Sequence, residues 1–179
     1  MTLKEILTKY GSLDLSQGTD KELRHRYADV YEELLSQFRE EPITLVEIGV
    51  QGGWSMRAWR DYFEFADLIG IDNRLQFDGV PEGWSFRLAD ATSHESLLDA
   101  LVAESIDVVI DDGSHRVEDQ IATAETLMHL ADLYIIEDIA GDEALALLIE
   151  TLGEPWKVFD RREIANGEFG DDIIAVWRS

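Results

Sequence analysis

The sequence predicts an α/β fold built on a doubly wound, mostly parallel sheet of seven strands with an antiparallel C-terminal strand. Short segments rich in Val and Ile alternate with longer amphipathic segments, the order expected when helices cover both faces of a parallel sheet. The chain has 179 residues, 45% of them hydrophobic, which is enough for one domain with a real core. We therefore expect a single domain over residues 1–179, with a short helical N-terminal arm at 1–40 and an α/β core at 41–179.

Periodicity and chain breakers place the elements. Hydrophobic spacing predicts a short helix at 3–10 and a longer helix at 21–40 that Asp20 caps, and Pro42 ends the arm. The core is then expected to contain strands at 43–48, 67–71, 84–88, 106–110, 133–136, 156–160 and 172–177, and helices at 54–63, 94–104, from about 116 to 131, and at 142–152. A turn-rich segment at 166–170 predicts antiparallel pairing of the last two strands.

Composition excludes several kinds of protein. The formal charge of −23 repels phosphate backbones, so we expect no nucleic-acid partner. We interpret this charge as solubility or adaptation to high salt rather than as attraction of a cationic substrate. The absence of cysteine excludes disulfides, thiolate metal sites and cysteine nucleophiles. No apolar run approaches the roughly 20 residues that span a bilayer, and the acidic start does not resemble a signal peptide. We expect an acidic, cytoplasmic protein without a membrane partner.

A glycine-rich turn joins the first strand of the core to its first helix. Its sequence, Glu47-Ile-Gly-Val-Gln-Gly-Gly53, allows a ligand to approach the backbone near Gly49 and Gly52. Asp72 follows about twenty residues later at the end of the next strand, where a carboxylate can accept both hydroxyls of a ribose. Asp90 ends the third strand, where it can accept from an adenine amino group. The turn lacks the spacing G-x-G-x-x-G of dinucleotide-binding proteins and the lysine of a P-loop.

Acidic residues also end the fourth and fifth strands. Val109-Ile-Asp-Asp-Gly-Ser-His115 and Ile135-Ile-Glu-Asp138 each run from buried β-branched residues into ionisable groups. Asp112, Glu137 and Asp138 offer three oxygen ligands for a hard cation, and His115 is a candidate base. Any one of these acids could instead cap a helix or end a strand in solvent, and a lone histidine often caps a helix. Acids at five successive strand ends favour a ligand with a positive centre, such as a sulfonium, beside a divalent metal.

These motifs resemble the class I S-adenosylmethionine-dependent methyltransferases, which have a Rossmann-like fold. The glycine turn, Gly70-Ile-Asp72 and Ala89-Asp-Ala91 stand at that family's usual places. The chain looks more specifically like the sugar O-methyltransferases of the macrocin and mycinamicin type. Three stretches carry this likeness: Gly18-Thr-Asp-Lys21 with His25, Tyr27 and Tyr31; Val109–His115; and Ile135–Asp138. The Asp-Asp-Gly-Ser-His element also occurs in relatives labelled cephalosporin hydroxylases.

The resemblance implies S-adenosylmethionine (SAM) and Mg²⁺ as cofactors and a hydroxylated small molecule as the acceptor. Asp112, Glu137 and Asp138 match the family's metal ligands, and His115 matches its general base. Asp111 either contacts the methionine part of the cofactor or only holds the turn. Sugar methyltransferases of this type have a longer N-terminal region that helps to build oligomers and the acceptor pocket. We therefore expect a differently built acceptor pocket and do not expect a macrolide acceptor, and a homo-oligomer is one alternative.

Other interpretations remain for the arm and for the function. His25 and Tyr27 fit structural packing as well as substrate contact, and Asp171 and Asp172 are most simply loop acids. A non-catalytic SAM-binding or scaffold protein is the main alternative to an O-methyltransferase. A nicotinamide-dependent oxidoreductase is a further alternative, against which the missing dinucleotide motif argues.

Overall fold

The computed structural model describes the chain apart from residues 80–81, 102–103, 154 and 166–169. Seven strands form one sheet in the order β3-β2-β1-β4-β5-β7-β6. All pairs are parallel except those that β7 makes with β5 and β6. The strands are β1 (Thr44–Ile48), β2 (Asp67–Asp72), β3 (Ser85–Leu88), β4 (Ile106–Asp111), β5 (Ala131–Ile136), β6 (Lys157–Asp160) and β7 (Ile173–Arg178). The predicted fold and the antiparallel pairing of the last two strands are confirmed, although most of the predicted turn at 166–170 lies outside the described residues.

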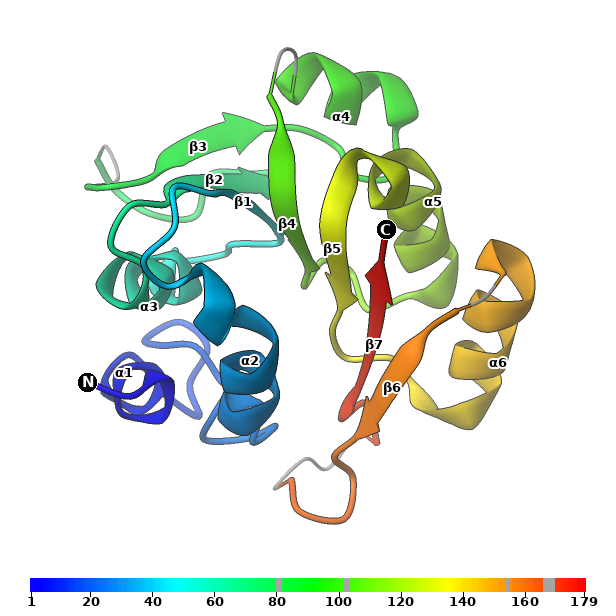
Figure 1. The fold of residues 1–179 in the computed structure, drawn as a ribbon, viewed down its shortest axis with the longest axis horizontal. Helices are drawn as coiled ribbons and strands as arrows, with labels where there is room; N and C mark the ends of the chain where they lie inside the picture. Colours follow the sequence, from blue (N-terminus) through cyan, green and yellow to red (C-terminus); the bar gives the residue numbers. More distant parts are fainter. Residues whose placement is uncertain (80–81, 102–103, 154, 166–169) are drawn as a thin grey trace.

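In the described part of the chain, six α-helices cover the two faces of this sheet. They are α1 (Leu3–Lys9), α2 (Ala28–Leu35), α3 (Trp54–Tyr62), α4 (His94–Ala100), α5 (Val117–Leu127) and α6 (Gly141–Leu152), and 3₁₀ turns extend α2 and α5. Figure 1 shows α1, α2 and α3 on one side of the sheet and α4, α5 and α6 on the other. Neighbouring residues of the central strands, such as Val108 and Val109, therefore enter separate apolar clusters. No helix of the described part is long and apolar enough to cross a bilayer.

The longer helix of the arm is shorter than predicted. It begins at Ala28 rather than at residue 21, and residues 21–25 form turns. Arg26 has a left-handed backbone (φ 60°), which interrupts any helix at that point. The hydrophobic spacing did not reveal this break, since Lys21 and His25 are held by tertiary contacts and such contacts can override local propensity.

The loops that follow β1 and β4 touch at the carboxyl edge of the sheet. The amide of Asp112 donates to the Ile48 carbonyl at 3.0 Å, and the amide of Glu137 donates to the Asp111 carbonyl at 2.9 Å. Gly49 has φ +83°, and a Cβ at this position would collide with the Asp112 carbonyl. Glycine is therefore required at 49, and the edge carries the acids of three adjacent strands close together.

Candidate active site

A cleft of about 280 Å³ opens beyond the ends of β1, β2, β3 and β4. Four of the six predicted cofactor residues line it, and these are Gly49, Asp72, Asp90 and Asp111. The order of the strands reverses at β1, which lies between β2 and β4, and the cleft lies beyond this point. Open α/β sheets bind ligands at such a reversal of strand order. A larger hollow around Arg39 and Arg60 contains none of the predicted site residues.

Backbone amides already orient the acids of this cleft. Asp72 accepts from the amide of Gln51 at 3.0 Å and from the amide of Arg74 at 3.1 Å. Asp90 accepts from the amide and hydroxyl of Thr92. Asp90 is thus fixed within its own loop, and Asp72 by its own loop together with the glycine turn.

Asp111 is the buried acid of the cleft. It is 2% exposed and accepts from the hydroxyl of Tyr134 at 3.1 Å. Burial raises the pKa of Asp111 to about 7, even though the bond from Tyr134 acts in the opposite direction. A cationic group of a bound ligand would therefore lower the pKa of Asp111 and favour its ionised form.

Two predicted cofactor residues lie elsewhere. Glu47 is completely buried, with one carboxylate oxygen accepting from Ser55 and Trp59 and the other 3.3 Å from the ammonium of Lys21. Gly52 borders a smaller cavity of about 60 Å³ instead. The loop at 15–20, Trp54 and His115 also contribute to this cavity.

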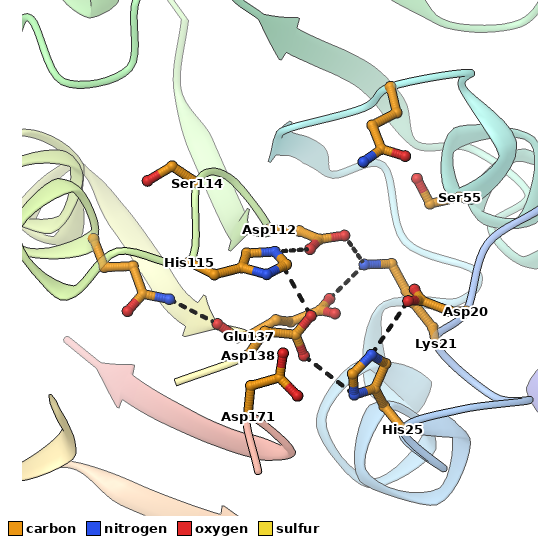
Figure 2. A network of polar contacts seen from close by, with 12 residues as sticks. Asp20, Lys21, His25, Ser55, Asp112, Ser114, His115, Glu137, Asp138 and Asp171 are labelled. Atoms are coloured by element: carbon orange, nitrogen blue, oxygen red, sulfur yellow. Dashed lines mark hydrogen bonds and ion pairs between the residues drawn. The ribbon is translucent and has the colours of Figure 1, made fainter. Parts of the chain in front are cut away.

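The acids that end β4 and β5 gather around one buried cation. The ammonium of Lys21 lies 2.6 Å from Asp112 Oδ2 and 2.6 Å from Glu137 Oε1 (Figure 2). Lys21 is 1% exposed, so this charge is held by protein groups alone. Lys21 belongs to the Gly-Thr-Asp-Lys motif, yet no pattern in the chain indicated that it lies among these acids.

Asp112, His115 and Asp138 form the open part of the cluster. One ligand atom from each lies within 4.8 Å of the others. His115 Nε2 is 3.2 Å from Asp112 Oδ1 and 3.6 Å from Asp138 Oδ2 (Figure 2). Glu137, the remaining predicted metal ligand, instead directs its carboxylate to Lys21 and to the hydroxyl of Tyr31.

The N-terminal arm supplies further partners. Tyr27 donates to Asp138 at 2.7 Å, and His25 lies 2.7 Å from Asp172 and 3.5 Å from Asp138. Asp172 is therefore a buried ion-pair partner at 1% exposure, and its interpretation as a loop acid is wrong. Carboxylate neighbours, chiefly Asp20 and Asp138, raise the pKa of His25 to about 9 against the lowering effect of burial.

The electrostatics of the cluster show a shortage of positive charge. Burial, reinforced by nearby carboxylates, raises the pKa of Glu137 and of Asp138. Burial alone would raise the pKa of Asp112 too, but Lys21 and His115 outweigh it and lower that pKa. The pKa of His115 rises to about 9 because the bond to Asp112 and the nearby acids overcome the effect of burial.

The backbone is strained around this cluster. Among the described residues, four non-glycine residues have positive φ: Arg26, Gln51, His115 and Asp138. Such conformations cost on the order of 1–3 kcal/mol each and tend to occur at functional sites. All four belong to the segments that form the cleft and the acid cluster.

Gln120 joins the cluster to the cofactor cleft. Its side chain is 2% exposed and donates to the Glu137 carbonyl at 2.9 Å, while its Oε1 has no hydrogen-bond partner. Gln120 lines the cleft, so a ligand with an N–H group could satisfy this acceptor. Sequence reasoning missed Gln120 because an isolated glutamine in a helix carries no motif.

Comparison with known proteins shows the family of the chain. No protein-family profile matches the chain. It is 34% identical over 138 residues to the 8-demethyl-8-α-L-rhamnosyl tetracenomycin-C 2′-O-methyltransferase of Streptomyces olivaceus, a match that covers 71% of this chain and 36% of that protein. It is 25% identical over 150 residues to the demethylmacrocin O-methyltransferase of Streptomyces fradiae, covering 78% of this chain and 35% of the relative. The chain thus spans about a third of the length of these curated relatives.

Solved structures show the same fold. The MycE methyltransferase of mycinamycin biosynthesis, in complex with Mg and S-adenosylhomocysteine (SAH), matches 100% of this chain and 55% of its own with a TM-score of 0.75 and 20% identity. A second MycE complex, which also holds mycinamycin VI, matches 77% of this chain and 39% of its own with a TM-score of 0.64. The predicted resemblance is therefore confirmed, and the chain is a relative of the macrocin and mycinamicin type of sugar O-methyltransferases with the Rossmann-like fold of class I methyltransferases.

Proposed function

We propose that this chain forms a single SAM-binding domain that transfers a methyl group to a hydroxyl of a small molecule, such as a sugar or natural product. One observation carries the proposal: Asp112, His115 and Asp138 converge directly beside the cleft that Asp72, Asp90 and Asp111 line. The Streptomyces olivaceus relative is by name a 2′-O-methyltransferase of a rhamnosyl tetracenomycin, and the Streptomyces fradiae relative is by name an O-methyltransferase, which supports a hydroxylated acceptor here.

The cleft fits SAM in the chemistry of its donors and acceptors. Asp72 would accept the ribose hydroxyls and Asp90 the adenine amino group, as carboxylates at these strand ends can. Asp111 would bind the cationic methionine end, and the free Oε1 of Gln120 would accept one of the ligand's N–H groups. Glu47 would act indirectly, since it holds the glycine turn through Ser55. Gly52 would keep the turn open beside the smaller cavity.

The acid cluster likewise fits Mg²⁺. Asp112 and Asp138 each have a carboxylate oxygen within 4.8 Å of the other and of a His115 nitrogen. Glu137 lies next to them, because Lys21 contacts both Glu137 and Asp112. Magnesium prefers oxygen ligands and retains several waters, so few protein groups are needed. When bound, the ion would orient two vicinal hydroxyls of the acceptor and lower the pKa of one.

His115 would receive the proton of the reacting hydroxyl. The acceptor oxygen attacks the sulfonium methyl carbon in line, the carbon–sulfur bond breaks with its electron pair going to sulfur, and the hydroxyl proton passes to Nε2 of His115. In the metal-free protein the nearby acids keep this nitrogen protonated at neutral pH, because they raise the pKa of His115 to about 9. Positive charge beside Asp112 and Asp138 opposes this effect, which links the base role to the cation.

A methyl-transfer assay tests the proposal. The protein is incubated with isotopically labelled SAM and a panel of glycosides with vicinal hydroxyls, beginning with an α-L-rhamnoside, in Mg²⁺ or in EDTA. We expect transfer that requires Mg²⁺, and calorimetric binding of SAH but not of NADH. Binding of SAH with no transfer to any acceptor would favour a SAM-binding scaffold, and NADH binding without SAH binding would favour an oxidoreductase.

A further inference from the structure

Lys21 is unlike the other lysines of the chain. The chain has four lysines, and the side chains of Lys4, Lys9 and Lys157 are 69%, 50% and 58% exposed. The side chain of Lys21 is 1% exposed, and its ammonium contacts three carboxylates. A buried ammonium is tolerated only when paired, so these contacts are what keep Lys21 inside the protein.

The three carboxylates come from three different strand ends. Glu47 is the penultimate residue of β1, Asp112 follows β4, and Glu137 follows β5. Lys21 itself comes from the N-terminal arm, so one side chain ties the arm to the whole reactive edge of the sheet. Lys21 is not among the described residues that line the cleft or the smaller cavity, so its contacts are with the acids rather than with either space.

The two oxygens of Asp112 have different partners. The ammonium of Lys21 occupies Asp112 Oδ2, while Asp112 Oδ1 faces His115 and the open side of the cluster. It also draws Glu137 away from Asp138, whose own carboxylate faces His115 and Tyr27. Among the described ion pairs, Lys21 is the cation of Glu47 and Glu137, whereas His115 pairs with Asp112 and Asp138.

We propose that Lys21 is a positioning residue that acts as the resident cation of the metal site. It holds Asp112 and Glu137 in place when no metal is bound, presents Asp112 Oδ1 and Asp138 to Mg²⁺, and weakens the affinity for Mg²⁺ through its own positive charge. The proposal rests on the proposed magnesium site. It predicts a protein that stays folded without metal and binds the ion reversibly.

The test replaces Lys21 by an uncharged side chain of similar length. The Lys21→Met variant is purified in EDTA and in 10 mM Mg²⁺, about the concentration that saturates weak sites. We expect a lower melting temperature in EDTA, a larger rise of that temperature with Mg²⁺ than in the wild type, and ~10-fold tighter Mg²⁺ binding by calorimetry because repulsion between the cations is lost. A purely structural role would lower both melting temperatures equally and leave the Mg²⁺ affinity unchanged, which would overturn the proposal.

Two further variants complete the design. Lys157→Met removes an exposed ion pair with Glu33 and should leave the response to Mg²⁺ unchanged. Lys21→Met combined with Glu137→Gln removes one charge of each sign, so this double variant should fold in EDTA even if the single variant does not. If neither variant folds with or without Mg²⁺, Lys21 serves packing rather than charge balance, and the proposal fails.

The measurements on the wild-type protein separate this inference from the proposed function. If the wild type ignores Mg²⁺ while Lys21→Met gains a response, the metal-dependent function is wrong and the resident-cation role stands. If neither protein responds to Mg²⁺, both are wrong.

Discussion

The two halves of the site are built in different ways. In the cofactor half, Asp72 and Asp90 are oriented by amides only two to twenty-one residues away in the chain. In the metal half, Asp112 and Glu137 are held by Lys21, which is 91 and 116 residues away. A local motif can therefore specify the first half, whereas the second forms only when the arm has packed against the sheet.

The difference extends to charge. Asp90 is exposed and needs no buried counter-ion, while Glu137, Asp138 and Asp172 are almost fully buried and depend on Lys21, His25 and tyrosine hydroxyls. Buried acids are costly unless they are paired, so the metal half must carry its partners within the fold. Mutations should consequently act on binding in the cofactor half, and on chemistry and metal response in the metal half.

The largest expected effect is on the chemistry of the metal half. His115→Ala should lower turnover about 10²–10⁴-fold, the usual range for a positioned proton acceptor, while SAH still binds with nearly wild-type affinity. Steady-state assays in saturating Mg²⁺ measure the first quantity and calorimetry the second. His94→Ala, a histidine of α4 outside the cluster, serves as the control and should retain activity. Full activity in a folded His115→Ala protein would remove His115 from the mechanism.

The next effect tests the point where the two halves touch. Gly49→Ala places a methyl group against the Asp112 carbonyl and also forces a φ of +83° on a residue with a side chain. We expect a loss of stability of roughly 1–3 kcal/mol or more, together with weaker SAH binding and a weaker response to Mg²⁺. Gly79→Ala is the matched control, since Gly79 has φ +84° but nothing within 4 Å of an added Cβ. Equal effects of the two substitutions in urea unfolding and in calorimetry would show that the two loops do not depend on each other.

A smaller effect should be confined to the cofactor half. Asp72→Ala removes the acceptor proposed for the ribose and should weaken SAH binding by roughly 1.5–3 kcal/mol, the scale for hydrogen bonds to charged groups. The Mg²⁺-dependent melting shift should stay at the wild-type value, because Asp72 contacts Gln51 and Arg74 rather than the acid cluster. Unchanged SAH affinity would take Asp72 out of the site, and a lost Mg²⁺ shift would contradict the separation of the halves.

The fold and the residues of the proposed cofactor half could be predicted from the sequence more completely than the residues of the proposed metal half. The central strands were recognisable because parallel strands buried on both faces appear as short runs rich in Val and Ile, and Asp72 ends one such run while Asp112 follows another. The roles of Lys21 and Asp172 were not recognisable, because each depends on a partner more than ninety residues away. The predicted helix at 21–40 begins only at Ala28, directly after Arg26 and Tyr27, because the left-handed backbone of Arg26 interrupts it.

The smallest expected effect is a change in the titration of His115. In the metal-free protein its pKa is raised from 6.5 to about 9 by Asp112 and the neighbouring acids, so the imidazole should stay charged through neutral pH. Because the folded-state pKa lies above the ordinary value, the contribution of this charge to stability is complete below about pH 6.5 and is lost as the pH rises through about 9. His25 has a pKa of about 9 for similar reasons and acts in the same window. Melting temperatures in EDTA should thus fall between these pH values, and less steeply in His115→Ala.

Mg²⁺ should shift this titration toward lower pH. An ion beside Asp112 and Asp138 neutralises the charges that favour protonated imidazole, so the C2–H resonance of His115 should titrate at a lower midpoint in Mg²⁺ than in NaCl of equal ionic strength. The rate of methyl transfer should then rise with pH through that lower midpoint, since the reaction needs the neutral base. Identical midpoints in the two salts would separate His115 from the metal, and the metal half would then lack the coupling between cation and base that its geometry indicates.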